Sequence, residues 1–503
     1  MVVSPYVRTV KTSSGARAVQ IVYANRRGSR TMEHIGSAHD EVELELLKAV
    51  ARQRLAAGQT ELDLGLEPAS GGPLPILGSR MATLVDVLVH GYRVLGLEHA
   101  TGGDEVFAQL VLARIIEPTS KLDSARVLAE AGIAPVSYPT LNRRLRAFAV
   151  PSWRQRLSAA CAARAGLGPA SLVLYDVSTL YFETDEGDGF REPGFSKERR
   201  LDPQITIGLL TDGSGFPLAV EAFEGNRAET ATMLPTIRAF MTAHRLREVT
   251  IVADAGMVSA ANQRAIEAEG LSFILGARIA DVPHVVRCWH DEHSGRQIPD
   301  GLVLTQPWPA GPTDQRRDQV IHYQYGADRA RRTLRGIDEQ VGKAQRAVAG
   351  KAPVKRNRFI TISGGTKTVN RALETKARTL AGWKGYVTNL VQADPAFVIG
   401  AYHQLWQIEK SFRMSKHDLQ ARPVFHHKRE SIEAHLTVVF AALAVSRWIE
   451  HETGWSIKRF VKTARRYREV TIQAGDHTLT AADPLPDDLA QAIKAIHNHR
   501  LAH

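Results

Sequence analysis

Residues 171–183 read SLVLYDVSTLYFE, an apolar run interrupted by one carboxylate, Asp176. Valine, leucine and tyrosine dominate the run before the aspartate, a composition typical of a buried strand. Two more strand patterns follow at 204–210 and 217–223, and the Gly-rich stretch 212–215 between them indicates a turn. The sequence therefore predicts three consecutive strands that form a meander.

The elements after the meander alternate between helix and strand. We expect helices at 231–244 and 259–269, and strands at 248–253 and 272–275. Three strands as a meander, then helix, strand, helix and strand, is the order of a ribonuclease H-like α/β fold, and it differs from the regular alternation of a doubly wound sheet. The strand at 248–253 is again followed by an aspartate, Asp254.

A third acidic residue, Glu409, lies far along the chain in 402–416, YHQLWQIEKSFRMSK. This stretch lacks Pro and Gly and predicts about four turns of helix, in which a sector roughly 120° wide mixes the carboxylate with basic and aromatic side chains. The sector contains Tyr402, Leu405, Trp406, Glu409, Phe412, Arg413 and Lys416. The alternative interpretation is a Glu409–Arg413 ion pair beside an ordinary core stripe.

Together, the two aspartates and the late helix resemble the DDE transposases of bacterial insertion sequences. One branch of that family carries, on its last catalytic helix, Tyr, two residues, Arg, three residues, Glu, six residues and Lys. Tyr402, Glu409 and Lys416 match this pattern in type and spacing. The Arg position is Leu405 here, and Arg413, one turn beyond the glutamate, is the candidate for the missing charge.

The 155 residues between Asp254 and Glu409 are too many for a loop in a compact domain, so we expect an inserted domain. The resemblance implies the same, because this branch carries a strand-rich insertion there. The expected domains are an N-terminal module (1–100), a helical region that binds DNA ends (101–168), a ribonuclease H-like core in two parts (169–282 and 385–450), the insertion domain (283–384) and a helical C-terminal tail (451–503).

The resemblance implies metal-dependent phosphodiester chemistry at the three carboxylates. Two Mg²⁺ ions about 3.5–4 Å apart can activate the attacking oxygen and stabilise the leaving oxygen, and Mg²⁺ takes hard oxygen ligands. If the strands before Asp176 and Asp254 are parallel neighbours, both carboxylates lie at one edge of the sheet. We expect Asp176 to bridge the ions, with Asp254 and Glu409 each holding one, and Mn²⁺ to substitute. Each aspartate alone is equally explained as a turn or cap residue.

Basic side chains indicate a polyanionic partner. The chain carries a net charge of +11, and 316–384 alone holds 17 Lys or Arg against 5 Asp or Glu. Helical patterns at 124–132 and 137–148 are similar to a helix-turn-helix. The candidate DNA contacts are Arg143 and Arg144 in that region, Arg331 and Arg332 in a basic helix with Arg329 and Arg335, and Tyr402, Arg413 and Lys416 in the late helix. A helical bundle and a solvated basic face are the alternatives.

No run approaches 18 apolar residues, and the N-terminus lacks the features of a signal peptide, so we expect a cytoplasmic, nucleoid-associated bacterial protein without a membrane partner. The two cysteines have no zinc-site spacing. Four histidines near the late helix, His403, His417, His426 and His427, lack the HxxxH spacing of zinc ligands within it. We expect double-stranded DNA as partner, both element ends and target, and a homodimer in a synaptic complex.

The function expected from this resemblance is a transposase that binds terminal inverted repeats, cleaves DNA and transfers strands. A ribonuclease H-like nuclease that only hydrolyses and a catalytically inactive DNA-binding protein are the alternatives. A fourth interpretation is a haloacid dehalogenase-like phosphatase with Asp176 as nucleophile. That chemistry requires an acid at position 178, where Ser178 stands.

Overall fold

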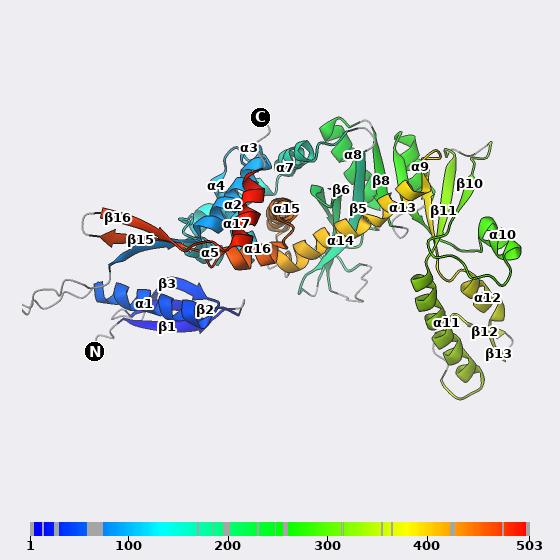
Figure 1. Cartoon of the computed structure of the whole chain (residues 1–503), viewed down its shortest axis with the longest axis horizontal. Coiled ribbons are helices and arrows are strands. Elements are labelled where there is room, and N and C mark those ends of the chain that lie inside the picture. The colour runs from blue at the N-terminus through cyan, green and yellow to red at the C-terminus, as the bar shows by residue number, and fades with distance from the viewer. Residues whose placement is uncertain are drawn as a thin grey trace, which may run out of the picture. The chain divides into compact units, whose positions relative to one another are not determined.

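The chain forms two compact units, the first made of residues 1–161 and 414–503 and the second of residues 162–413 (Figure 1). We treat each unit by itself. The computed structural model describes residues 5–12, 15–24, 30–57, 74–168, 171–184, 186–194, 202–228, 231–246, 248–254, 260–312, 314, 316–353, 356–363, 366–422, 428–474 and 477–498.

The first unit begins with an antiparallel three-stranded sheet of β1 (Tyr6–Lys11), β2 (Arg17–Ala24) and β3 (Arg30–Ala38). Helix α1 (Glu41–Ala57) packs on it through a core that includes Val19, Ile21 and Leu44. The N–H of Glu43 donates to Asp40 Oδ1 at 2.9 Å, so the aspartate caps the helix as its position predicts.

Helices build the rest of the first unit around one long apolar helix. Their bounds are α2 (Ala82–Val94), α3 (Leu97–Ala100), α4 (Glu105–Ile116), α5 (Ser124–Ala131), α6 (Tyr138–Phe148), α7 (Pro151–Ala165), α15 (Arg429–Thr453), α16 (Ile457–Ala464) and α17 (Asp487–His497). Helix α15 contacts α2, α4, α6, α16 and α17. It is the one described helix long and apolar enough to cross a membrane, but its apolar window is buried, which is typical of a core helix.

The C-terminal tail contains strands as well as the expected helices. Strands β15 (Glu469–Ala474) and β16 (His477–Ala482) form a hairpin, and β15 also pairs with β4 (Ile76–Arg80). Arg80 Nε donates to Glu469 Oε2 at 2.8 Å across this pairing. The purely helical prediction was wrong because these strands are stabilised by a partner almost 400 residues earlier, which local periodicity does not encode.

The second unit is built on an eight-stranded mixed sheet in the order β10-β11-β14-β9-β8-β5-β6-β7. The strands are β5 (Ser171–Tyr181), β6 (Gln204–Asp212), β7 (Pro217–Glu224), β8 (Val249–Ala253), β9 (Ser272–Ala277), β10 (Val303–Trp308), β11 (Gln319–Tyr325) and β14 (Trp383–Thr388). Strand β8 is parallel to both β5 and β9, and the other pairings are antiparallel. The predicted meander and the two strands after it are therefore confirmed.

Helices α8 (Met233–His244) and α9 (Ala260–Ala268) connect β7 to β8 and β8 to β9, as predicted. Two later helices also contact the sheet. Helix α13 (Pro395–His403) contacts β8, β9 and β14, and α14 (Leu405–Arg413) contacts β5 and β6.

The segment expected to be a separate inserted domain is divided in the structure. Its strands β10 and β11 extend the main sheet through β14, which pairs with β9. Helix α10 (His284–Glu292) contacts β10. The remainder has its own core, including Ile337 and Phe359, made by α11 (Ala327–Val348), α12 (Arg371–Thr379) and the hairpin of β12 (Ile360–Ser363) and β13 (Thr366–Val369).

Candidate active site

Two aspartates from distant parts of the sequence lie near the end of one parallel strand pairing. The last pair of β5 with β8 is Leu174 with Val252. Asp176 and Asp254 each follow their member of this pair by two residues, Asp176 within β5 and Asp254 just after β8. Neighbouring strands lie about 4.8 Å apart, so the backbone at both aspartates lies at the same end of this pairing.

Asp176 lies inside its strand and not after it, which differs from the sequence prediction. Strand β5 continues to Tyr181 because it stays paired with β6, where Leu209 lies opposite Asp176. Strand β8 ends one residue before Asp254. The two aspartates therefore lie where the parallel pairing ends and where one side of β5 loses its neighbour.

The late helix is not one regular helix. It breaks at Gln404, between α13 and α14, and residues 414–418 form a π-helix. The backbone N–H of Gln404 donates to Ala401 O at 3.1 Å. This bond spans three residues, whereas the regular α-helical bond spans four, so the turn is tighter here. Because of this break and the π-helix, a constant 100° per residue does not describe the whole of 402–416.

The side chains of that sector consequently have different environments. Tyr402 is buried, whereas Glu409, Arg413 and Trp406 are exposed. The alternative interpretation was a Glu409–Arg413 ion pair beside a core stripe. Within the described chain Glu409 and Arg413 form no ion pair, so this part of the interpretation is wrong. Ile408, Phe412 and Leu419 are buried as a core stripe requires, and Leu405 is only half-buried.

Tyr402 connects the helix to the second aspartate. Its hydroxyl donates to Asp254 Oδ1 at 2.6 Å, and its ring meets that of Tyr386 edge to face, with centroids 5.0 Å apart. Burial raises the pKa of Tyr402, and the hydrogen bond to Asp254 raises it further, so the phenol stays protonated and continues to donate. Tyr386 in turn bonds through its hydroxyl to His403 Nε2 at 3.2 Å. The hydrogen bond of Tyr402 to Asp254 thereby joins helix α13 to the end of β8.

A lysine absent from the sequence prediction lies among these groups. Lys384 of β14 places Nζ 4.3 Å from the ring centroid of Tyr402. Burial lowers the pKa of Lys384, while the charges of Asp254 and Glu409 raise it. Both carboxylates therefore act on this ammonium group. Its signal in the sequence, WKGYVT, is a single charge in an otherwise uncharged strand.

Arg329 adds a second positive charge on this side of the sheet. Its Nη1 donates to Gly382 O at 2.9 Å, and its charge lowers the pKa values of Lys384 and His403. For His403 burial is the larger cause. The arginine was predicted as part of a basic helix that could bind DNA, and it lies in the first turn of α11.

The donor set suits a hard divalent cation at the aspartate pair. Among the described residues no three Asp, Glu, His or Cys side chains are close enough together to hold a metal ion. Two carboxylates are nevertheless a sufficient protein contribution for Mg²⁺, which keeps several waters and binds substrate phosphates. Glu409 lies on the helix that crosses β5, and its charge acts on Tyr402 and Lys384. Two of the four histidines weighed as zinc ligands, His426 and His427, lie outside the described residues.

The remaining candidate DNA contacts differ in their exposure and in whether another side chain already pairs with them. In the second unit, Arg332 is exposed, and the exposed Arg331 pairs with Asp328. In the first unit, Arg143 is exposed and donates to Thr140 Oγ1 at 3.3 Å. Arg144 instead donates to Asp104 Oδ2 at 2.9 Å, which holds α6 to the start of α4. Lys416 belongs to the π-helix of the first unit.

Comparison with known families identifies the class of protein. The family model described as Transposase DDE domain matches residues 168–445, more than half of the chain, and the chain belongs to this family. DDE transposases generally use divalent metal ions. No curated protein matches the chain. Among solved structures, piggyBac transposase in a synaptic complex with hairpin DNA matches 83% of this chain and 75% of its own chain, at 10% identity and a TM-score of 0.38, a similarity too low to carry an argument.

Proposed function

We propose that this chain cuts DNA at the ends of an insertion sequence and joins those ends to target DNA. Asp176, Asp254 and Glu409 would hold two Mg²⁺ ions, or Mn²⁺ in their place. The observation that supports the proposal is the parallel pairing of β5 with β8, which brings the strand that contains Asp176 beside the strand that ends just before Asp254. The transposase family of residues 168–445 supports the same conclusion.

The sheet supports a ribonuclease H-like core. Its five strands β7-β6-β5-β8-β9 combine the predicted meander, in which β6 is antiparallel to both neighbours, with β8, which is parallel to both of its own. We propose that 283–384 is the insertion between β9 and the late helix. In this arrangement part of the insertion lengthens the core sheet, and α11 with its neighbours projects as a separate subdomain.

The protein groups have distinct roles in the proposed reaction. Asp176, Asp254 and Glu409 would hold the metal ions, which when bound would supply Lewis acidity at the attacking and leaving oxygens. Tyr402 fixes the orientation of Asp254 by donating to Oδ1, which leaves Oδ2 as the ligand. Lys384 would face the scissile phosphate and offset its negative charge, the role that the resemblance gives to an arginine at position 405. Glu409 completes the ligand set from α14.

The test uses DNA that carries the inverted repeats flanking the coding region. We expect Asp176→Asn, Asp254→Asn and Glu409→Gln each to lower Mg²⁺-dependent cleavage at least about a hundredfold, since each removes a metal ligand. Binding of the same DNA without metal should stay within a few-fold of wild type. Glu292→Gln, an exposed carboxylate of the same unit, is the matched control.

The outcomes separate the candidate functions. Full activity of the Asp176 or Asp254 variant would refute the site. A wild-type chain that binds DNA and never cleaves it would favour the inactive DNA-binding protein. An assay with precleaved DNA ends distinguishes a transposase from a nuclease. Joined product supports a transposase, and hydrolysis without joining supports a nuclease.

A further inference from the structure

A cavity of about 630 Å³ lies within the first unit. It is bounded by α4, the loop 118–123, α6 and α15. The lining residues are Leu110, Arg114, Pro118, Thr119, Ser120, Lys121, Leu122, Asp123, Ser124, Tyr138, Leu145, Gln420, His435 and Val438. Its volume lies within the range of pockets that bind small molecules or parts of larger ligands.

Arg114 brings an uncompensated charge to this cavity. Among the described residues its guanidinium has no hydrogen-bond or ion-pair partner, although five N–H groups are available. Burial lowers the pKa of Arg114 to about 10, and no acidic side chain opposes that effect. The group is still charged at neutral pH. Enclosing a cation without a counter-charge is costly unless a ligand supplies one.

The acid in the wall does not supply that counter-charge. Both oxygens of Asp123 accept from Arg126, at 2.9 Å for Oδ1 and 2.8 Å for Oδ2, and Thr119 donates to Oδ2 as well. Lys121 has no partner within the described part of the chain. Ser120 Oγ accepts from the N–H of Asp123, which leaves its own proton available to a ligand. The cavity thus offers two unpaired cations and a hydroxyl donor.

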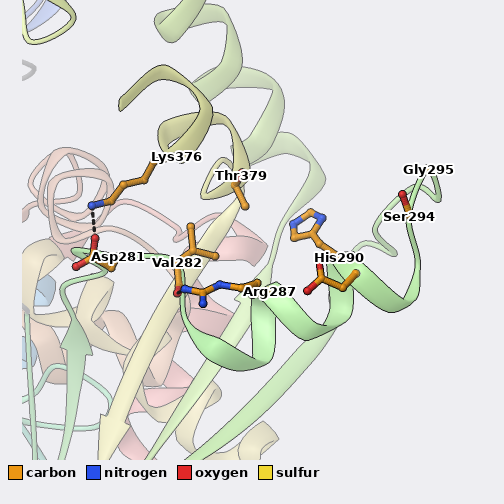
Figure 2. A pocket seen from close by; sticks show the side chains of 9 residues that line it. Asp281, Val282, Arg287, His290, Ser294, Gly295, Lys376 and Thr379 are labelled. Carbon is orange, nitrogen blue, oxygen red and sulfur yellow. Dashed lines mark hydrogen bonds and ion pairs between the residues drawn. The ribbon is translucent and has the colours of Figure 1, made fainter. Parts of the chain in front are cut away.

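A second cavity shows how the first differs. It has a volume of about 690 Å³ and lies between α10 and α12 (Figure 2). There Lys376 is already paired with Asp281, and both Asp291 and Arg287 line the cavity. Charges of both signs balance one another in that cavity. In the Arg114 cavity the cations remain uncompensated.

We propose that the Arg114 cavity binds a backbone phosphate of DNA. The two unpaired cations indicate that the ligand is an anion. The basic helix α6, which lines the cavity, indicates that this anion belongs to DNA. Tyr138 and Leu145 of α6 line the cavity, and the same helix exposes Arg143 and Arg146 and contains no acidic residue. A DNA strand along this basic helix face would bring a phosphate to Arg114. The inference rests on the proposed function only for the identity of the polyanion.

The experiment measures binding of a random-sequence duplex to the full chain as salt is varied. Arg114→Met should weaken binding about tenfold at moderate salt and lower the slope of log K against log [salt] by about 0.9, the value for one phosphate contact. Arg114→Lys should keep the slope. Arg52→Met removes an exposed charge from α1 and should leave both quantities unchanged.

Thermal unfolding separates binding from folding. Because Arg114 has no partner, its replacement by an apolar side chain of similar length should leave the melting temperature unchanged or raise it. Unchanged affinity and slope in Arg114→Met would overturn the inference, and so would a lowered melting temperature with unchanged slope. Stabilisation of wild type by dAMP that is lost in Arg114→Met, with duplex binding intact, would also overturn it in favour of a free nucleotide. DNA affinity, its salt dependence and the melting temperature are all measured without cleavage. A failure of the proposed cleavage reaction is therefore distinguishable from a failure of this inference.

Discussion

Replacement of Tyr402 by Phe removes one hydroxyl and leaves the ring in its contact with Tyr386. The lost hydrogen bond, 2.6 Å long, runs to a carboxylate, and such bonds contribute about 1.5–3 kcal/mol. Tyr402 is 4% exposed, but Asp254 is exposed, so solvent competes at the acceptor and the expected loss is near the lower end, about 1.5 kcal/mol. For a unit of 252 residues this corresponds to a melting temperature lower by about 3–6 °C.

The assay is thermal unfolding by circular dichroism without metal, in a double-mutant cycle with Asp254→Ala. We expect Tyr402→Phe to destabilise wild type and to have almost no further effect on Asp254→Ala, because the interaction is then already absent. Tyr6→Phe, an exposed tyrosine of the first unit, controls for the loss of a hydroxyl. Additive effects of the two substitutions would refute the bond between α13 and the end of β8. They would also remove the argument that Tyr402 orients a metal ligand.

Two further predictions concern charge. Lys384→Met should lower Mg²⁺-dependent cleavage about 10- to 100-fold in single-turnover assays, and Lys384→Arg should retain most activity. Lys367→Met, which replaces an exposed lysine, is the control and should have no effect. Full activity of Lys384→Met would contradict the proposed contact of Lys384 with phosphate. In the first unit, burial alone would raise the pKa of Glu130, but hydrogen bonds from His34 and Arg126 lower it to about 2, below its ordinary value of 4.5. The pKa of Glu130 is lower in the folded than in the unfolded state, so Glu130 stabilises the fold above about pH 4.5. About 3 kcal/mol of the free energy of unfolding is lost as the pH falls toward 2. Glu130→Gln should flatten that part of the pH dependence measured by urea unfolding.

Local patterns predicted the elements that carry the aspartates. The apolar runs before Asp176 and Asp254 are strands, and the meander, α8 and α9 follow in the expected order. Periodicity identifies such elements because their buried residues are close in sequence. It does not identify pairings over long separations. The pairing of β14 with β9 joins residues 108 apart, Gly385 and Ala277, and nothing local to either strand specifies it.

The late helix shows a second limit of pattern reasoning. A constant 100° per residue holds only while the helix is regular, and the helix is broken at Gln404, between Tyr402 and Glu409. The hydroxyl of Tyr402 donates to Asp254, while Glu409 is exposed on the following helix. The spacing of the two residues did not predict this break, and their roles in the site stay a prediction.

In the proposed site the cation comes from a strand. Leu405 begins α14 directly after the break and is half-buried, so the helix position that the resemblance assigns to an arginine holds an apolar residue. Lys384 lies on β14, which pairs directly with β9 and so extends the core sheet. The charges of Asp254 and Glu409 act on its ammonium group, which lies against the ring of Tyr402. In the proposed reaction a strand would therefore supply the positive charge that the helix lacks at position 405.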